Sequence, residues 1–332
     1  MKTELLLSFV IGVALAAAYT PVASALNAAT GTQLSAASVN NANQADPADV
    51  GAAQAAVLRA QILLDRAHFS PGEIDAAYGG NMRKAIAAYQ QSKSLSASGA
   101  LDAATWSMLN KDDVPALSDY VITDADVAGP FVSIPASMSG KSKLPALAYG
   151  SALEALGEKF HASPRLLRRL NASADFSRAG ETISVPNVLS PEPIPAAAKV
   201  VVDRSDASVS VLDAAGKILA RYPASTGSSY DPLPVGTWKI QGIARNPIFN
   251  YNPKLFWDAK ASSVKAKIAP GPNNPVGVVW IDLSKEHYGI HGTPEPSKIG
   301  KTESHGCIRL SNWNADSLAS AVSPGMTALL QE

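Results

Sequence analysis

Ser304-His305-Gly306-Cys307-Ile308-Arg309-Leu310 contains the one cysteine of this 332-residue chain. A single cysteine forms no internal disulfide, so disulfide bonds do not stabilise the fold. Two interpretations of the thiol follow. It is a small buried hydrophobic side chain, as most free cysteines are, or it is a nucleophile that works with a histidine. Because a thiol reacts as its thiolate, the second interpretation requires a base near Cys307.

The chain offers five histidines as that base: His68, His161, His287, His291 and His305. The first two fall in segments with a helical pattern, far from Cys307 in sequence. The pair His287 and His291 has the i, i+4 spacing of a helical zinc site. This pair, however, follows a predicted strand and encloses Gly289, and an extended chain would separate the two rings by about 13 Å. We therefore favour nucleophilic catalysis over zinc and expect no metal and no cofactor.

His291 is the strongest candidate for the base because Gly292 follows it. Glycine lets the backbone pass close to the imidazole, so a main-chain carbonyl can accept the Nδ1 proton and fix the tautomer. No carboxylate stands directly beside His291 in the sequence. We therefore expect a triad completed by a backbone carbonyl, with Gly292 as the candidate.

The residues around the cysteine are predicted to shape the site. Gly306 permits an unusual turn in which the Cys307 amide and neighbouring N–H groups face a developing oxyanion. His305 either assists there or holds the loop. Arg309 lies on the same side as Cys307 if the segment is extended, where it grips a substrate carboxylate or braces the loop. The sequence leaves both alternatives open.

Residues 196–332 have the pattern of a mainly β domain. Strands are predicted around 200–202, 209–212, 218–220, 237–240 and 278–281, and one helix over 314–322. The order of motifs in this region resembles the L,D-transpeptidase catalytic domain of the YkuD family. The resemblance covers about residues 197–331 and rests on Ser225-Thr226-Gly227, Pro234-x-Gly236-Thr237, Pro270 to Gly277, His291-Gly292-Thr293 and the cysteine motif.

The resemblance implies a cysteine enzyme without metal that acts on peptidoglycan tetrapeptide stems. The family would cleave the bond between L- and D-centres, release terminal D-alanine and pass the acyl group to an amine, with Cys307 as nucleophile and His291 as base. His305, Gly306 and Arg309 belong to the motif that shapes its site. The acceptor could be another stem, a protein or an amino acid. An L,D-carboxypeptidase that uses water, and a non-catalytic wall-binding protein, are the alternatives.

Residues 50–112 are predicted to form a three-helix domain. Apolar residues recur at helical spacing over 57–64, Asn81 is a candidate cap of a second helix and Asp102 of a third. The segment resembles the peptidoglycan-binding domain type 1, through Pro71-Gly72-x-Ile74-Asp75, Tyr78-Gly79-x-Asn81, the stretch Ala87 to Gln90, Gly99 and Asp102-x-x-Thr105-Trp106. That resemblance implies a peptidoglycan glycan or stem as partner.

Residues 113–190 are predicted to be a LysM-like region or a spacer. Helices over 151–160 and from Ser163-Pro164 to Leu170, followed by a strand over 182–185, resemble the LysM module. Its opening Gly-Asp-Thr signature is replaced by Tyr149-Gly150-Ser151. The predicted fold class is thus multidomain α+β, with a helical domain, a small α/β region and a mainly β catalytic domain.

Residues 1–25 resemble a secretory signal peptide, with Lys2, an apolar run over 5–18 and Ala23-Ser24-Ala25. An uncleaved anchor is the alternative. Residues 26–49 are predicted to be a disordered linker, since they offer few large apolar groups. The 28 basic and 28 acidic residues cancel, which gives no electrostatic basis for binding nucleic acid. We expect a protein of the periplasm or cell envelope, without a stable membrane span after signal cleavage.

Overall fold

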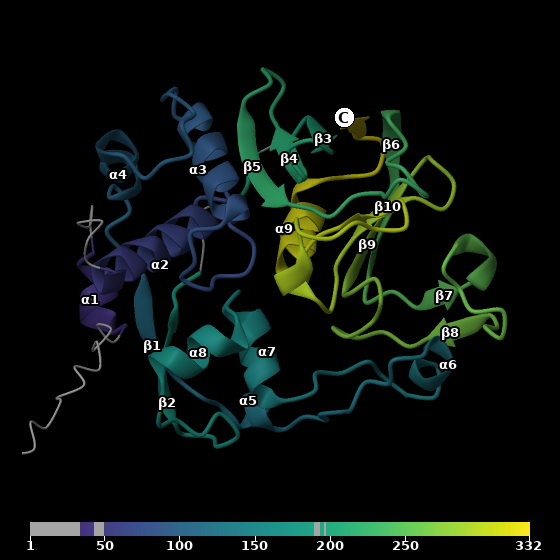
Figure 1. Cartoon of the computed structure of the whole chain (residues 1–332), viewed down its shortest axis with the longest axis horizontal. Coiled ribbons are helices and arrows are strands. Elements are labelled where there is room, and N and C mark those ends of the chain that lie inside the picture. The colour runs from purple at the N-terminus through teal and green to yellow at the C-terminus, as the bar shows by residue number, and fades with distance from the viewer. Residues whose placement is uncertain (1–33, 43–49, 189–192, 196) are drawn as a thin grey trace, which may run out of the picture. The chain divides into compact units, whose positions relative to one another are not determined.

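The computed structural model describes residues 34–42, 50–188, 193–195 and 197–332 (Figure 1). The predicted signal peptide, residues 1–25, lies outside these described residues. Within them, no helix combines the length and the apolar character that crossing a membrane requires.

A short helix, α1 (Ala36–Asn40), lies within the predicted linker, so the prediction of disorder is wrong there. The helix begins with a capping box, and Leu34 and Val39 are buried. The Asn40 side chain accepts the Leu117 N–H at 2.7 Å and donates to the Leu117 carbonyl at 3.0 Å. The buried side chains of Leu34 and Val39 and the hydrogen-bonded Asn40 amide order this stretch. The polar composition of the whole segment does not reveal such single contacts.

Three helices follow in the described chain: α2 (Val50–Arg66), α3 (Gly80–Ser92) and α4 (Ala103–Leu109). The predicted N-cap of α4 is confirmed, because the Asp102 carboxylate accepts the Thr105 N–H at 2.8 Å. The predicted cap of α3 is wrong. That helix starts after Gly79 without a side-chain cap, and Asn81 lies inside its first turn.

The middle segment, defined here as residues 113–188, adds a small α/β unit. Its elements are β1 (Leu117–Val121), α5 (Asp124–Val127), α6 (Met138–Lys141), α7 (Ala152–Lys159), α8 (Pro164–Leu170) and β2 (Thr182–Pro186). The two strands pair antiparallel, and β1 is an element that the sequence pattern did not show. The LysM resemblance of this segment stays a prediction.

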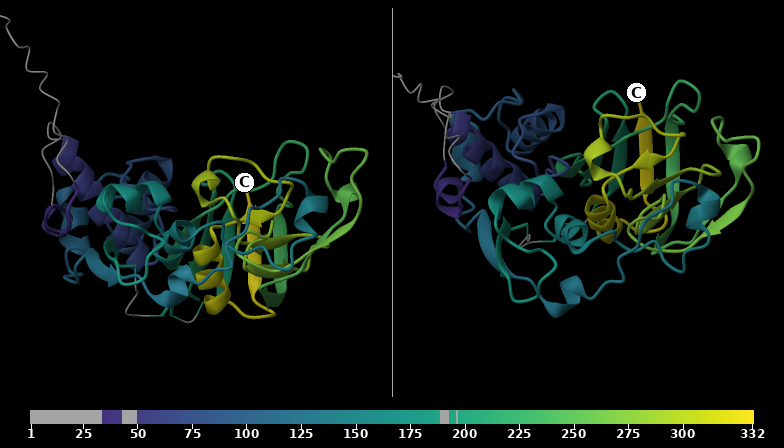
Figure 2. Two further views of the ribbon diagram at one scale, coloured as in Figure 1. Left: turned by 90° about the horizontal axis from the view of Figure 1, so that it is seen from below. Right: turned by 60° about the horizontal axis from the view of Figure 1, so that its bottom comes forward.

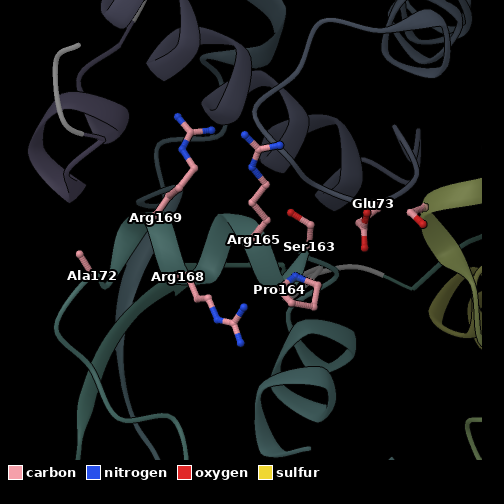
Figure 3. Close-up of a pocket in the computed structure, with 8 residues that line it drawn as sticks. Glu73, Ser163, Pro164, Arg165, Arg168, Arg169 and Ala172 are labelled. Atoms are coloured by element: carbon pink, nitrogen blue, oxygen red, sulfur yellow. The ribbon is translucent and has the colours of Figure 1, made fainter. Parts of the chain in front are cut away.

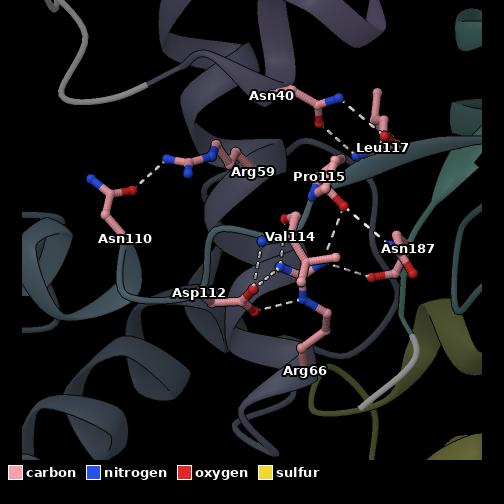
Figure 4. A network of polar contacts seen from close by, with 9 residues as sticks. All are labelled: Asn40, Arg59, Arg66, Asn110, Asp112, Val114, Pro115, Leu117 and Asn187. Atoms are coloured by element: carbon pink, nitrogen blue, oxygen red, sulfur yellow. Dashed lines mark hydrogen bonds and ion pairs between the residues drawn. The ribbon is translucent and has the colours of Figure 1, made fainter. Parts of the chain in front are cut away.

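The middle segment shares its core with the helices before it. Leu58 and Ile62 of α2 belong to the same buried cluster as Leu156 and Val185. Beside that cluster, the buried Arg66 guanidinium donates to Asp112 at 2.7 Å and to the carbonyls of residues 114 and 115 at 2.9 and 3.1 Å (Figure 4). The junction at residues 112–115 is therefore fixed by a buried charge and its hydrogen bonds, which is unlike a loose linker.

An eight-stranded sheet dominates residues 197–332, with the strand order β11-β10-β9-β6-β12-β3-β4-β5. The bounds are β3 (Lys199–Asp203), β4 (Ser208–Leu212), β5 (Ile218–Pro223), β6 (Gly236–Arg245), β9 (Val279–Leu283), β10 (Gly289–His291), β11 (Ile308–Arg309) and β12 (Thr327–Gln331). Buried and less buried residues alternate along β3, β9 and β12, as expected for strands with one face on a core. The predicted mainly β region is confirmed.

Helix α9 (Asn312–Ala321) and a ribbon of β7 (Phe249–Tyr251) and β8 (Ala266–Ile268) complete this region (Figure 2). Short 3-10 turns lie at Pro253–Leu255 and Pro296–Lys298. The α9 residues Ala315 and Leu318 are buried in the same core as Ile281 and Ile290 of the sheet. Helix α9 begins at Asn312, just after the cysteine motif, so this packing also fixes the chain that leaves the motif.

Candidate active site

The sheet register brings the two predicted catalytic residues to the same edge. β10 and β11 pair parallel, with Ile290 opposite Ile308 and His291 opposite Arg309. Both isoleucines are fully buried in the core. Since side chains alternate across a strand, His291, Arg309 and the residue just before β11, Cys307, project to the opposite face. His291 and Cys307, 16 positions apart in the sequence, thus meet at one end of the sheet.

His291 is held by contacts to its backbone and to its ring. Its side chain is buried, and Nδ1 lies 2.7 Å from the carbonyl oxygen of Gly292. Trp280, its partner across the β9–β10 pair, stacks on the imidazole with 5.4 Å between ring centroids. The carbonyl can only accept, so Nδ1 carries the proton and Nε2 has the free lone pair.

Burial keeps this imidazole neutral. Desolvation lowers the pKa of His291 from 6.5 to about 4, the Gly292 carbonyl opposes that shift, and the positive charge of Arg309 adds to it. Near neutral pH the ring is therefore a proton acceptor.

Cys307 is half-buried, and its Sγ lies 3.6 Å from the carbonyl oxygen of His287. Burial raises the pKa of the thiol, while a hydrogen bond from the Gly289 backbone and the charge of Arg309 lower it. Asp231 raises this pKa as well. Burial is the largest of these effects, so the resting residue is a thiol.

Glycine is required at position 306 for two reasons. Its φ is +90°, and a Cβ there would lie 2.7 Å from Cε1 of Tyr288. The loop is also held from its other side, because the N–H of Ser304 donates to the Thr226 carbonyl at 2.9 Å and the N–H of Ser225 to the Arg309 carbonyl at 3.0 Å. The Ser-Thr-Gly motif therefore supports the cysteine loop.

His305 and Arg309 form a chain of contacts that ends at Asp258. The Arg309 guanidinium lies 3.4 Å from Nδ1 of His305, whose Nε2 lies 2.9 Å from Asp258. Asp258 comes from the connection between β7 and β8, and Phe256 and Trp257 from the same connection pack against the His305 ring. Of the two alternatives open for each residue, these contacts favour loop bracing for His305. Arg309 is both braced and close enough to act on the cysteine and on His291 electrostatically.

The ring of His287 lies apart from this arrangement, although its carbonyl faces Cys307. His287 lies in the turn before β10 and is exposed, whereas His291 is buried in the strand. Nδ1 of His161 lies 2.7 Å from Oδ2 of Asp65, and the His161 ring stacks on Trp313. Across the described ranges, no group of three or more His, Cys, Asp or Glu residues is placed to hold a metal ion.

Three residues at the site were not found from the sequence: Trp280, Tyr288 and Asn312. The alternation of the strand at 278–281, continued through a hairpin to Gly289, could have placed Trp280 opposite His291. The contacts of Tyr288 with Gly306 and of Asn312 with Gly292 are long-range, and no local pattern signals them.

A concave surface lies mainly on the middle segment. Its walls are Glu73, Ser163, Pro164, Arg165, Arg168, Arg169, Ala172 and Ser297 (Figure 3). None of the predicted site residues lines it. Figure 3 shows Arg165 and Arg169 projecting to one side of α8 and Arg168 to the other, which gives this helix a basic surface.

Two regions of the chain match models of known protein families. Residues 197–329 match the family model of the L,D-transpeptidase catalytic domain, and residues 53–109 match that of a peptidoglycan binding domain. The chain belongs to the L,D-transpeptidase family.

Its relatives carry the same family name. A protein named L,D-transpeptidase YkuD from Bacillus subtilis is 30% identical over 177 residues, which is 53% of this chain and 91% of the relative. One named YbiS from Escherichia coli K12 is 29% identical over 116 residues, 31% of this chain and 37% of that protein. Among solved structures, an L,D-transpeptidase from Mycobacterium smegmatis is similar over 52% of this chain and 86% of its own, at 23% identity and a TM-score of 0.32.

Proposed function

We propose that the protein is a peptidoglycan L,D-transpeptidase with Cys307 as nucleophile and His291 as general base. The cysteine sulfur attacks the carbonyl carbon of the L,D peptide bond in a tetrapeptide stem. The C–N bond breaks, D-alanine leaves, and the stem stays on the sulfur as a thioester. An amine then attacks the thioester and takes over the acyl group, so cross-linking needs no nucleotide.

One observation carries the proposal: the Nδ1 of His291 faces the Gly292 carbonyl at 2.7 Å. This contact leaves Nε2 as the acceptor, on the sheet face to which Cys307 projects. A backbone carbonyl thus takes the orienting place that a carboxylate holds in other catalytic triads.

The proton moves during attack in this proposal. A thiol with a raised pKa and an imidazole with a lowered pKa rest as a neutral pair. As the S–C bond forms, the thiol proton passes to Nε2, which then protonates the leaving amine of D-alanine. Arg309 stabilises negative charge that develops on the sulfur, and the backbone N–H groups at the Gly306 turn are assigned to the oxyanion.

The upstream regions would hold the enzyme on its polymer. We assign residues 50–112 to peptidoglycan binding, 113–190 to a LysM-like or spacer region and 196–332 to catalysis. The substrate and the binding domain both point to the cell envelope as the place of action. Partners are the stems and glycan of peptidoglycan, and the acceptor is an amine of a stem, a protein or an amino acid.

The test is to incubate the full chain with tetrapeptide stems and identify the products by mass spectrometry. Cross-linked dimers and free D-alanine are the expected products. Free tripeptides without dimers would indicate the L,D-carboxypeptidase instead. Unreacted stems, from a protein whose melting curve shows that it is folded, would contradict both and leave a wall-binding protein.

A further inference from the structure

The contacts behind His291 lead out of the catalytic region and into the middle segment. His291 depends on the position of the Gly292 carbonyl, and the backbone there is packed tightly. A Cβ on Gly292 would lie 2.2 Å from Oδ1 of Asn312, and one on Gly277 would lie 2.0 Å from the same atom. The Asn312 amide therefore fills the space between two backbone turns, one of which holds the catalytic histidine.

The orientation of this amide is set by three hydrogen bonds. Oδ1 accepts the Val278 N–H at 3.2 Å, and Nδ2 donates to the Pro272 carbonyl and to Oε2 of Glu158, both at 3.1 Å. Asn312 is almost fully buried. Both amide protons are thus used, and losing either acceptor would leave a buried donor unpaired.

Glu158 is the one partner of this amide that comes from the middle segment, where it lies on α7. The Tyr149 hydroxyl faces the same carboxyl and lowers its pKa. Burial raises the pKa of Glu158 to about 7, and the groups that face it are Tyr149, Asn312, Glu154 and His161. A partly buried carboxyl that accepts a hydrogen bond from a buried amide is a fixed group, unlike an exposed side chain on a spacer helix.

Contacts on both sides of Glu158 hold α7 against the catalytic region. Asn273 donates to Oε1 of Glu154 at 2.7 Å and to the Ala148 carbonyl at 3.0 Å. His161 stacks on Trp313, the residue after Asn312, at 5.2 Å between centroids and 9° between planes. The hydrogen bond from Asn312 therefore reaches an anchored helix.

We propose that the middle segment is a positioning part of the active site: Glu158, through Asn312, holds the Gly292 backbone against which His291 is oriented. This inference rests on the proposed role of His291 as base. It gives residues 113–188 a function in catalysis that does not depend on their binding glycan. Glu158 and Asn312 are positioning residues, since each would act on His291 through the Gly292 backbone.

The test compares Glu158→Ala, Glu158→Gln and the control Glu181→Ala in the full chain. Glu181 lies in the same segment and pairs with Arg178 on its surface. The readouts are kcat and KM for acylation by a tetrapeptide stem, their pH profile, and the melting temperature. If Glu158→Ala does not fold, Glu158→Asp replaces it, because its carboxylate is one methylene too short to reach Asn312.

We expect Glu158→Ala to lower kcat on the order of ten- to a hundredfold, as misplacement of a catalytic group by about 1 Å does. KM should stay within about twofold of wild type, because substrate contacts are intact. The acid limb of the pH profile should move, since the Gly292 carbonyl contributes to the pKa of His291. Glu158→Gln keeps an acceptor oxygen and should recover most of the rate, and Glu181→Ala should match wild type.

Wild-type kcat and an unmoved acid limb in a folded Glu158→Ala protein would overturn the positioning role. So would an equal loss in Glu181→Ala, because that would be a general effect on the fold. Absence of any acyl-enzyme in the wild type would instead contradict the proposed function itself.

Discussion

At the scale of single residues, the site is defined by how burial changes two ordinary side chains. His291 is kept neutral and Cys307 protonated by the same desolvation, so the reactive ion pair is absent before substrate binds. Arg309 is near both. A lone cysteine in the sequence indicated a nucleophile, but its protonation state depends on neighbours such as Gly289 and Asp231 that only the fold brings close.

The free energy of unfolding in acid should depend on the buried imidazole of His291. The pKa of His291 is about 4 in the folded chain and 6.5 without its surroundings. Between these values the unfolded chain binds a proton that the folded one does not, so the free energy of unfolding falls as pH falls. Denaturant titrations measure this free energy. As pH falls across that window, the free energy of unfolding of wild type should drop by about 3 kcal/mol more than that of His291→Gln.

Glu73 and Glu158 act with the opposite sign, since their pKa values are raised to about 7. Both carboxyls are present in wild type and in His291→Gln, so their contributions to the pH dependence of stability cancel when the two proteins are compared. Parallel stability curves for wild type and His291→Gln would mean that His291 titrates normally and is not buried as described.

At the scale of elements, the strands were easier to predict than the contacts between loops. Valine-rich runs at 200–202 and 209–212 marked β3 and β4, and Asp102 marked the start of α4, because these signals are local. The capping of α3 by Asn81 was wrong since its amide donates to the Ile299 carbonyl at 2.9 Å. That bond spans 218 residues, and no local pattern contains it.

In the candidate site, too, the features with a local sequence signal were predicted and the long-range contacts were not. The lone cysteine indicated Cys307, the glycine after His291 indicated both the base and its carbonyl contact, and the resemblance of two motifs to a known family agreed with this choice. From other elements, Trp280 stacks on the His291 ring and Asn312 packs against the Gly292 backbone. Their role follows from strand pairing and helix packing, which a single sequence does not specify.

The turn before β11 should tolerate no side chain at Gly306. Gly306→Ala introduces strain at φ +90° together with a Cβ 2.7 Å from the Tyr288 ring. We expect a loss of about 1–3 kcal/mol in unfolding free energy, and a lower acylation rate because the cysteine loop must shift.

Gly216→Ala is the matched control, with φ +83° and nothing within 4 Å of the added Cβ. It carries the backbone strain alone and should leave acylation unchanged. If the two variants lose equal stability and both keep full activity, the contact with Tyr288 does not shape the loop.

At the scale of the whole molecule, the chain joins a matched peptidoglycan binding domain to a matched L,D-transpeptidase domain. The segment between them is part of the same packing: it shares a buried cluster with α2 and contacts α9 beside the site. A formal net charge of zero is consistent with recognition of the proposed peptidoglycan substrate by these domains and not by long-range electrostatics.

The central claim is that Cys307 carries the stem as a thioester, and intact-protein mass spectrometry tests it most directly. Wild-type full chain mixed with a tetrapeptide stem, and quenched in acid early, should gain the mass of the stem minus D-alanine. Cys307→Ala should gain nothing under the same conditions. An equal mass gain in Cys307→Ala, or stem conversion at the wild-type rate by that variant, would contradict the account.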